Sequence, residues 1–205
     1  MLVYSSAAFT AVLGWLILKE ELTQTKGLVV VMSLLGSALV VNAFNSSMWK
    51  LNTTGVIAGI SAGLFYAVYS IMGRSVSQRG LNTWTTLFYI FAFASIFMLG
   101  FNIFSGGKIP GSAANRAEML WLGNAWVGWL LLALLAVGPT LMGFGLYNVS
   151  LRYLPSSTAN LVAMIEPVFT AIFAYVLFGE ILTAMQLGGA AMILAGVAAL
   201  RVGKE

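Results

Sequence analysis

The chain contains no cysteine, no histidine and no aspartate. Disulfide bonds, zinc sites with thiolate or imidazole ligands and Ser-His dyads are therefore excluded. The only acidic residues are six glutamates, at positions 20, 21, 118, 166, 180 and 205. Because the usual acid-base and metal-binding side chains are missing, an intramembrane enzyme is disfavoured, and we expect neither a cofactor nor a metal ion.

Charge is scarce as well. Charged residues make up 8% of the 205 residues and hydrophobic residues 60%, whereas roughly 25% of the residues of a soluble domain are charged. A chain this apolar cannot cover a surface that faces water, so the lipid bilayer is its expected solvent. The net charge of +4 does not indicate a nucleic-acid partner, because the ten basic residues are scattered between apolar runs and form no patch.

Seven apolar stretches are long enough to cross a bilayer, which takes about 20 residues of helix. They lie at about 1–18, 25–44, 54–73, 83–105, 124–147, 155–178 and 183–201. The predicted fold class is therefore an all-α integral membrane protein with about seven transmembrane helices.

The basic residues predict the orientation, because cytoplasmic loops collect Lys and Arg. One side of the membrane carries Lys19, Lys26, Arg74, Arg79, Arg152, Arg201 and Lys204. The other side carries Lys50, Lys108 and Arg116. We therefore predict a multi-pass protein of the cell membrane (an inner or plasma membrane) with a cytoplasmic C-terminus.

The chain also repeats itself at an offset of 160 residues, where 9–40 align with 169–200 without a gap. The shared positions include the Phe-Thr-Ala triplets at 9–11 and 169–171 and the glutamates at 20 and 180. The two copies begin five helices apart. Since five is odd, the copies cross the membrane in opposite directions, which is typical of secondary transporters with inverted repeats.

The repeat divides the chain into three predicted parts. Residues 1–44 form the last two helices of a first repeat, residues 45–53 are a linker, and residues 54–205 form a complete second repeat of five helices. On this interpretation the chain is the remnant of a ten-helix protein with an inverted five-plus-five arrangement, and about three helices are expected upstream.

Four segments in the expected order and spacing resemble the EamA-like family of the drug/metabolite transporter superfamily. They are residues 147–155 (YNVSLRYLP), 165–169 (IEPVF), 178–180 (FGE) and 188–196 (GGAAMILAG). The resemblance implies ten helices in two inverted repeats and transport of amino acids or other small metabolites, often outward. The first copy departs from the second in carrying Ser6-Ala7 where the second has Glu166-Pro167.

Glu166 is the leading candidate for substrate binding or coupling, because it is the only acid well inside a predicted span. A carboxylate at such a position costs at least ~2.5 kcal/mol unless it is paired. The alternative is a neutral glutamate hydrogen-bonded to a neighbouring helix. Pro167 removes a backbone donor beside it and predicts a helix break, and Thr170 follows one turn later on the same face.

Other candidates have structural alternatives of similar weight. Asn160 lies on the same polar stripe as Glu166, where it lines a cavity or packs helices together. Tyr66 and Tyr69 share a helix face and either stack on a substrate or occupy an interfacial position. Pro139 predicts a second broken helix, with a simple kink as the alternative.

The sequence thus favours a carrier that moves a small-molecule substrate by alternating access, most simply as an exporter of metabolites such as amino acids. The alternative is a truncated membrane scaffold, or a subunit that does not transport by itself. In either case a homo-oligomer or a partner chain could supply the missing helices.

Overall fold

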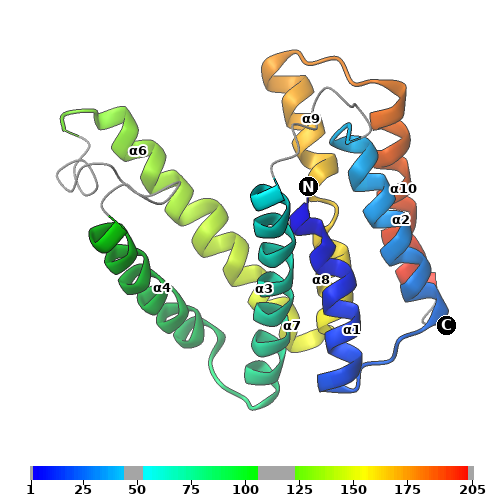
Figure 1. Ribbon diagram of the computed structural model, residues 1–205, viewed down its shortest axis with the longest axis horizontal. Coiled ribbons are helices and arrows are strands. Elements are labelled where there is room, and N and C mark those ends of the chain that lie inside the picture. The colour runs from blue at the N-terminus through cyan, green and yellow to red at the C-terminus, as the bar shows by residue number, and fades with distance from the viewer. Residues whose placement is uncertain (1, 44–52, 106–122, 203–205) are drawn as a thin grey trace. The chain divides into compact units, whose positions relative to one another are not determined.

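The computed structural model describes residues 2–43, 53–105 and 123–202, and every regular element in these ranges is a helix (Figure 1). This confirms the predicted all-α class. The predicted linker at 45–53 lies outside the described residues except for Thr53. The helices are η1 (Leu2–Ser5), α1 (Ser6–Leu18), α2 (Gln24–Val40), α3 (Thr53–Gln78), α4 (Thr83–Ser105), α6 (Trp126–Leu135), η3 (Ala136–Gly143), α7 (Phe144–Tyr153), α8 (Ser156–Ala163), α9 (Glu166–Phe178) and α10 (Ala184–Val202).

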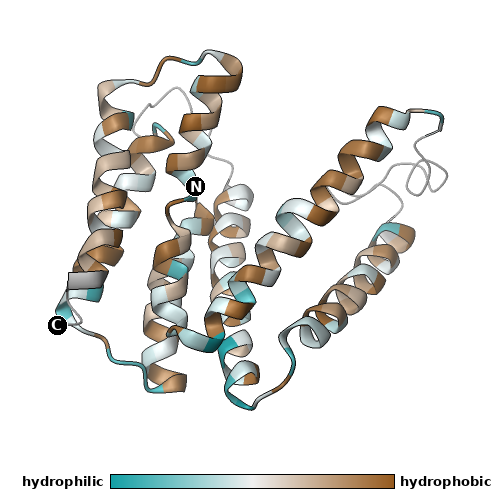
Figure 2. Ribbon diagram, turned by 180° about the vertical axis from the view of Figure 1, so that it is seen from behind, coloured by the Kyte–Doolittle hydropathy of each residue, from teal (hydrophilic) through white to brown (hydrophobic). Residues whose placement is uncertain are grey.

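The helices fall on the seven predicted spans. Within the described ranges, four helical stretches are long and apolar enough to cross a membrane: Thr54–Gln78, Thr83–Phe104, Trp126–Tyr153 and Ser156–Phe178. Three shorter apolar helices, Leu2–Leu18, Gln24–Val40 and Ala184–Leu200, account for the remaining predicted spans. Figure 2 shows apolar residues along most of the helices, with the hydrophilic ones concentrated near the turns.

Two helices extend further than the apolar stretches predicted. α3 continues to Gln78, beyond the predicted end at 73, and the helix begun by α6 continues to Tyr153, beyond the predicted end at 147. The added turns carry polar residues such as Arg74 and Arg152. Since a helix keeps its backbone hydrogen bonds where it leaves the lipid, hydropathy predicts the apolar part of a helix rather than its full length.

The described chain divides into two compact units, Met1–Val76 with Leu151–Glu205, and Ser77–Ser150. In the second unit, Asn82 caps α4, because its side-chain oxygen accepts hydrogen bonds from the backbone N–H groups of Trp84 (2.9 Å) and Thr85 (3.2 Å). The rings of Phe91 and Phe144 pack edge to face with centroids 5.7 Å apart. Aromatic contacts of this kind join α4 to the helix that contains α7.

In the first unit, α2 and α10 form the most extensive helix pair, and they lie side by side in Figure 1. Their closest approach is at two glycines. A Cβ atom at Gly36 would lie 2.7 Å from the carbonyl oxygen of Gly189, and a Cβ atom at Gly189 would lie 2.6 Å from that of Gly36. The two backbones therefore touch, as small residues allow in membrane helices.

A second contact fixes the direction of the pair. Gly196 lies opposite Val29, because a Cβ atom at Gly196 would lie 3.5 Å from Val29 Cγ1. Moving from Val29 to Gly36 along α2 thus corresponds to moving backward from Gly196 to Gly189 along α10, so the helices are antiparallel. In the repeat, Gly36 corresponds to Gly196 and Val29 corresponds to Gly189. Each of the two contacts is therefore the repeat-related copy of the other. This is the direction that an inverted repeat requires.

Glycines of α3 are also used for close packing. A Cβ atom at Gly59 would lie 2.8 Å from the Cβ of Leu2, and one at Gly63 would clash with the hydroxyl of Ser5. A capping box lies at the start of α10: Thr183 Oγ1 accepts from the N–H of Gln186 at 3.3 Å, and Gln186 Oε1 accepts from the N–H of Thr183 at 2.9 Å.

Candidate functional site

The predicted break beside Glu166 separates two helices. α8 ends at Ala163, and α9 begins at Glu166 with Pro167 in its first turn. The residues between them form tight turns, in which the N–H of Ile165 donates to the carbonyl of Val162 at 3.2 Å. Proline is well suited to the first turn of a helix, where its missing N–H has no partner to lose. The break therefore places a carboxylate at the start of a new helix within one apolar span.

Glu166 and Thr170 both lie on the exposed surface of the first unit. The Thr170 hydroxyl donates to the backbone carbonyl of Glu166 at 3.0 Å, a bond within its own helix. In the part of the chain that the structure describes, the Glu166 carboxylate makes no hydrogen bond or ion pair. The side chain of Tyr4 lies close enough to interact with it electrostatically. No other described group of this unit therefore binds the Glu166 carboxylate.

Asn160 lies elsewhere, in a buried polar cluster between α1 and α8. Its side chain is 1% exposed, donates to Thr10 Oγ1 at 3.2 Å and accepts from Ser6 Oγ at 3.4 Å. A buried amide needs both kinds of partner, and here α1 supplies them. In this structure Asn160 therefore joins two helices, whereas Glu166 and Thr170 face away from the packed interior.

We expect Asn160→Leu to lower the thermal stability of the detergent-solubilised protein. The substitution leaves the Thr10 and Ser6 hydroxyls buried without their partner, and hydrogen bonds between membrane helices are worth about 0.6 to 1.7 kcal/mol each. A loss of about 1–2 kcal/mol is expected, and it should shrink when Thr10→Val is already present. Thr170→Val, which removes only a bond within one helix, serves as the control. Equal effects of the two single substitutions would contradict this role.

The remaining predicted residues occupy two further places. Tyr66 and Tyr69 are half-buried on α3, with ring centroids 6.0 Å apart and ring planes at 35°. Pro139 lies in the second unit inside η3, which is π-helical. The Thr140 hydroxyl there donates to the carbonyl of Leu135 at 3.0 Å. Pro139 thus distorts a continuous helix rather than ending it, because side-chain and π-type bonds take over the freed backbone groups.

Sequence reasoning missed the most strongly bonded polar contact of the first unit. The carboxylate of Glu20, in the turn after α1, accepts hydrogen bonds from the N–H (2.6 Å) and hydroxyl (2.7 Å) of Ser156 and from the N–H (3.2 Å) and hydroxyl (2.6 Å) of Ser157. These residues are the first turn of α8, where unpaired N–H groups and the helix dipole favour an anion. Pro155-Ser156-Ser157 is a typical helix start, but nothing in the sequence pairs it with Glu20.

The chemistry of this contact agrees with a charged carboxylate. Burial of Glu20 would raise its pKa, but the hydrogen bonds from Ser157 and Ser156 outweigh burial, so the pKa of Glu20 lies below its ordinary value. Glu20 is therefore ionised at neutral pH.

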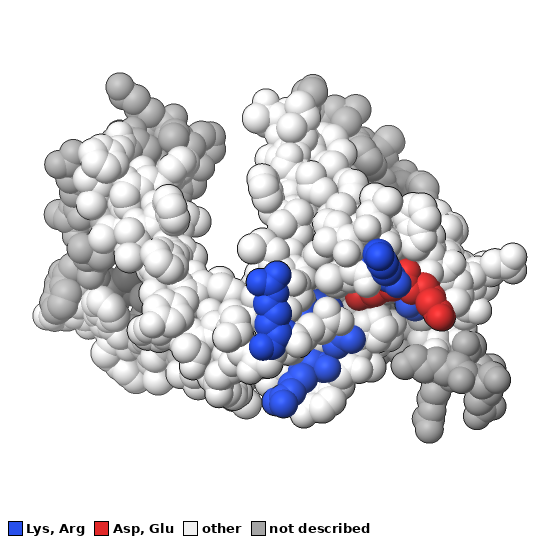
Figure 3. All heavy atoms as spheres, turned by 90° about the horizontal axis from the view of Figure 1, so that it is seen from below, with Lys and Arg blue, Asp and Glu red and all other residues white. Residues whose placement is uncertain are grey.

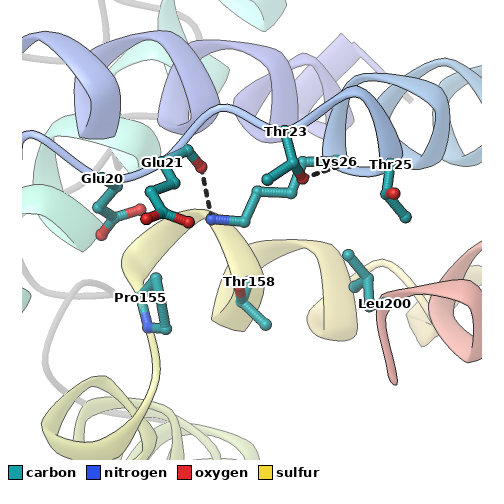
Figure 4. A pocket seen from close by; sticks show the side chains of 8 residues that line it. All are labelled: Glu20, Glu21, Thr23, Thr25, Lys26, Pro155, Thr158 and Leu200. Carbon is teal, nitrogen blue, oxygen red and sulfur yellow. Dashed lines mark hydrogen bonds between the residues drawn. The ribbon is translucent and has the colours of Figure 1, made fainter. Parts of the chain in front are cut away.

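A cavity of about 240 Å³ opens beside this contact, at the end of the first unit where α1 ends and α8 begins (Figure 4). Its walls carry the side chains of Glu20, Glu21, Thr23, Thr25, Lys26, Pro155, Thr158 and Leu200. The ammonium of Lys26 donates to the carbonyl of Glu21 at 2.8 Å. Figure 3 views the molecule from this end and shows basic and acidic side chains together on it. The cavity thus brings charged and polar side chains together with apolar wall atoms.

Comparison with known proteins places these features in a family. The EamA-like transporter family matches residues 53–202. An uncharacterized transporter of Archaeoglobus fulgidus is 34% identical over 145 residues, which cover 71% of this chain and 47% of that protein. An uncharacterized transporter of Synechocystis is 27% identical, covering 99% of this chain and 58% of the relative.

A third relative carries a more specific name. A probable amino-acid metabolite efflux pump of Salmonella typhimurium is 24% identical, covering 96% of this chain and 64% of the pump. The chain therefore spans about half to two thirds of the length of these curated relatives. No solved structure matches the chain significantly.

Proposed function

The chain belongs to the EamA-like transporter family, and from this premise we propose that it works in a secondary carrier for small metabolites. Amino acids and related amines are the substrate class that we propose first, because one relative is named as a probable amino-acid metabolite efflux pump. Export across the cell membrane is part of the same proposal. The uneven distribution of Lys and Arg supports the proposed orientation, with the C-terminus in the cytoplasm.

The observation that carries the proposal is the antiparallel pairing of α2 with α10 through contacts that the internal repeat exchanges. Inverted repeats of this kind allow a carrier to open alternately to the two sides, because one repeat can rock against the other around a central site. A broken helix within one span, as between α8 and α9, is a second feature that such carriers use.

Within this carrier we propose Glu166 and Thr170 as the residues that meet the substrate or the coupling ion. Both are exposed at the start of α9, and a carboxylate without a protein partner can accept a proton or an ammonium group. Tyr66 and Tyr69 are proposed as a stacking surface on α3. Asn160 is not assigned to substrate contact, because its donor and acceptor are bonded to α1.

We further propose that the working carrier contains helices besides those of these 205 residues, either in a longer polypeptide or in a partner chain. Support comes from the relatives, of which this chain matches 47%, 58% and 64% of the length. The same fact favours the second candidate, a membrane subunit that does not transport by itself.

Counterflow in proteoliposomes separates the two candidates. Vesicles that hold the complete carrier (the longer polypeptide, or this chain with its partner chain) and an unlabelled amino acid should take up the same labelled amino acid transiently and saturably, which vesicles without protein should not do. A panel of amino acids and amines identifies the substrate. The complete absence of counterflow, together with no substrate-dependent change in thermal stability, would favour the non-transporting subunit.

A further inference from the structure

Glu20 connects two parts of the repeat architecture. It belongs to the turn between α1 and α2, in the first copy of the repeat, and its carboxylate is bonded to Ser156 and Ser157 of α8, in the second part of the chain. Both serines are buried. Contacts between the two halves of an inverted repeat are the ones that can break when one half rocks against the other.

The turn around Glu20 is shaped for this contact. Lys19 adopts the left-handed backbone conformation with φ 56°, and the N–H of Glu20 donates back to the carbonyl of Gly14 at 3.0 Å. A Cβ atom at Gly14 would lie 2.8 Å from Glu20 Oε2 and 3.3 Å from the Ser156 hydroxyl. The carboxylate therefore occupies the space that any side chain at position 14 would fill.

The second copy of the repeat has the glutamate without this arrangement. Glu180 occupies the position of Glu20, but Ala174 stands where the first copy has Gly14. Glu180 is exposed, and among the described residues its carboxylate has no recorded hydrogen bond or ion pair. Among the described residues, the bonded glutamate is thus the one at the end where α1 finishes and α8 begins.

We propose that Glu20 is the latch that closes this end of the carrier, by holding the first turn of α8 against the end of α1. This inference rests on the proposed transport function and adds to it the residue that must release before the pathway opens at the end we assign to the cytoplasm. While this end is closed, the carboxylate accepts hydrogen bonds from N–H groups at the start of α8 that have no partner within the helix. When the helices part, water takes the place of the carboxylate.

Because the chain contains no cysteine, a single introduced thiol reports on opening without interference. Ala11 is a suitable position, since it is 5% exposed and lies on the α1 face between Ala7, which packs in a cluster with Leu161 of α8, and Gly14. In inside-out membrane vesicles, a membrane-impermeant maleimide should label Ala11→Cys slowly. Adding Glu20→Gln should accelerate labelling about tenfold, because the amide loses the charge and one acceptor oxygen.

Two further substitutions keep the test decisive. Gly14→Ala keeps Glu20 and both serines unmutated, but its methyl group fills the space of the carboxylate. It should therefore accelerate labelling as Glu20→Gln does, and it provides the test if Glu20→Gln fails to fold. Glu180→Gln is the matched control and should leave the rate unchanged. Wild-type labelling rates in folded Glu20→Gln and Gly14→Ala, or equal acceleration by Glu180→Gln, would overturn the latch.

The labelling needs no substrate, so the two proposals fail separately. A wild-type protein without counterflow removes the transport function whatever the labelling rates are. A protein that shows counterflow while Glu20→Gln and Gly14→Ala label at the wild-type rate retains the transport function and loses the latch.

Discussion

Glu166→Gln is expected to abolish the pH dependence of transport and to weaken the binding of amine-bearing substrates by about ten- to a hundredfold. Glutamine keeps the shape of the protonated side chain but can neither release a proton nor pair with an ammonium group. The reduction corresponds to losing one hydrogen bond to a charged partner. Because the Glu166 carboxylate has no recorded partner in the described part of the chain, the variant should fold and insert normally.

The physical basis is the cost of charge inside a bilayer. A carboxylate within a span is stable only when a cation accompanies it, and either a proton or a substrate ammonium can serve. In the proposed carrier the two would exchange at one site. This exchange is the linkage that a proton-coupled exporter requires, and Glu166→Gln breaks it while leaving the rest of the site intact.

Counterflow and proton-driven transport in proteoliposomes at two pH values measure both effects. Thr170→Ala, one turn further along α9, should change substrate affinity while preserving the pH dependence, because it removes a hydroxyl and no charge. Glu180→Gln removes a glutamate in the turn after the same helix and should change neither. Rates and pH dependence equal to those of the wild type in Glu166→Gln would refute its coupling role and favour a structural one.

The helices were the part of the fold that could be predicted from the sequence, because apolar length and turn residues are local signals. The repeat also allowed a prediction about tertiary structure. Matches such as Gly36 with Gly196 predicted opposite directions for the two hairpins, and α2 and α10 are indeed antiparallel. The assignment of residues 1–44 and 54–205 to a first and a second repeat of five helices stays a prediction.

The side-chain partners could not be predicted, since they depend on how helices far apart in the sequence meet. Asn160 and Glu166 share a polar stripe in the sequence, but the break at 164–165 separates their helices, and Asn160 turns to Thr10 across 150 residues. The sequence identified Glu20 only as a position shared by the two copies of the repeat, although Ser156 and Ser157 bind its carboxylate. Hydropathy cannot distinguish a carboxylate in water from one at a buried helix start.

The backbone contact between α2 and α10 yields the second large effect. Gly189→Ala should destabilise the protein by about 3 kcal/mol, near the upper part of the range for overpacked interiors. The new Cβ atom would lie 2.6 Å from the Gly36 carbonyl oxygen, 2.7 Å from Leu39 Cβ and 2.9 Å from the Val40 nitrogen. Backbone atoms cannot rotate away as a flexible side chain would, so α2 and α10 must separate along their length.

The neighbouring residue provides the control. A Cβ atom at Gly188 meets nothing within 4 Å, and alanine is a better helix former than glycine by up to ~1 kcal/mol. Gly188→Ala should therefore leave the stability unchanged or raise it slightly. Thermal unfolding in detergent, followed by circular dichroism, measures both variants, and equal effects of the two substitutions would show that α2 and α10 do not touch at Gly189.

The contact is reciprocal, and this gives the test a second arm. Gly36→Ala should cost about as much as Gly189→Ala, because its Cβ atom would lie 2.7 Å from the Gly189 carbonyl oxygen and 2.8 Å from Ile193 Cγ1. One separation of the helices relieves both clashes, so the double variant should lose clearly less stability than the two single losses together. Additive losses would mean that the two glycines act at independent places, and the antiparallel pairing that supports the inverted repeat would then have to be abandoned.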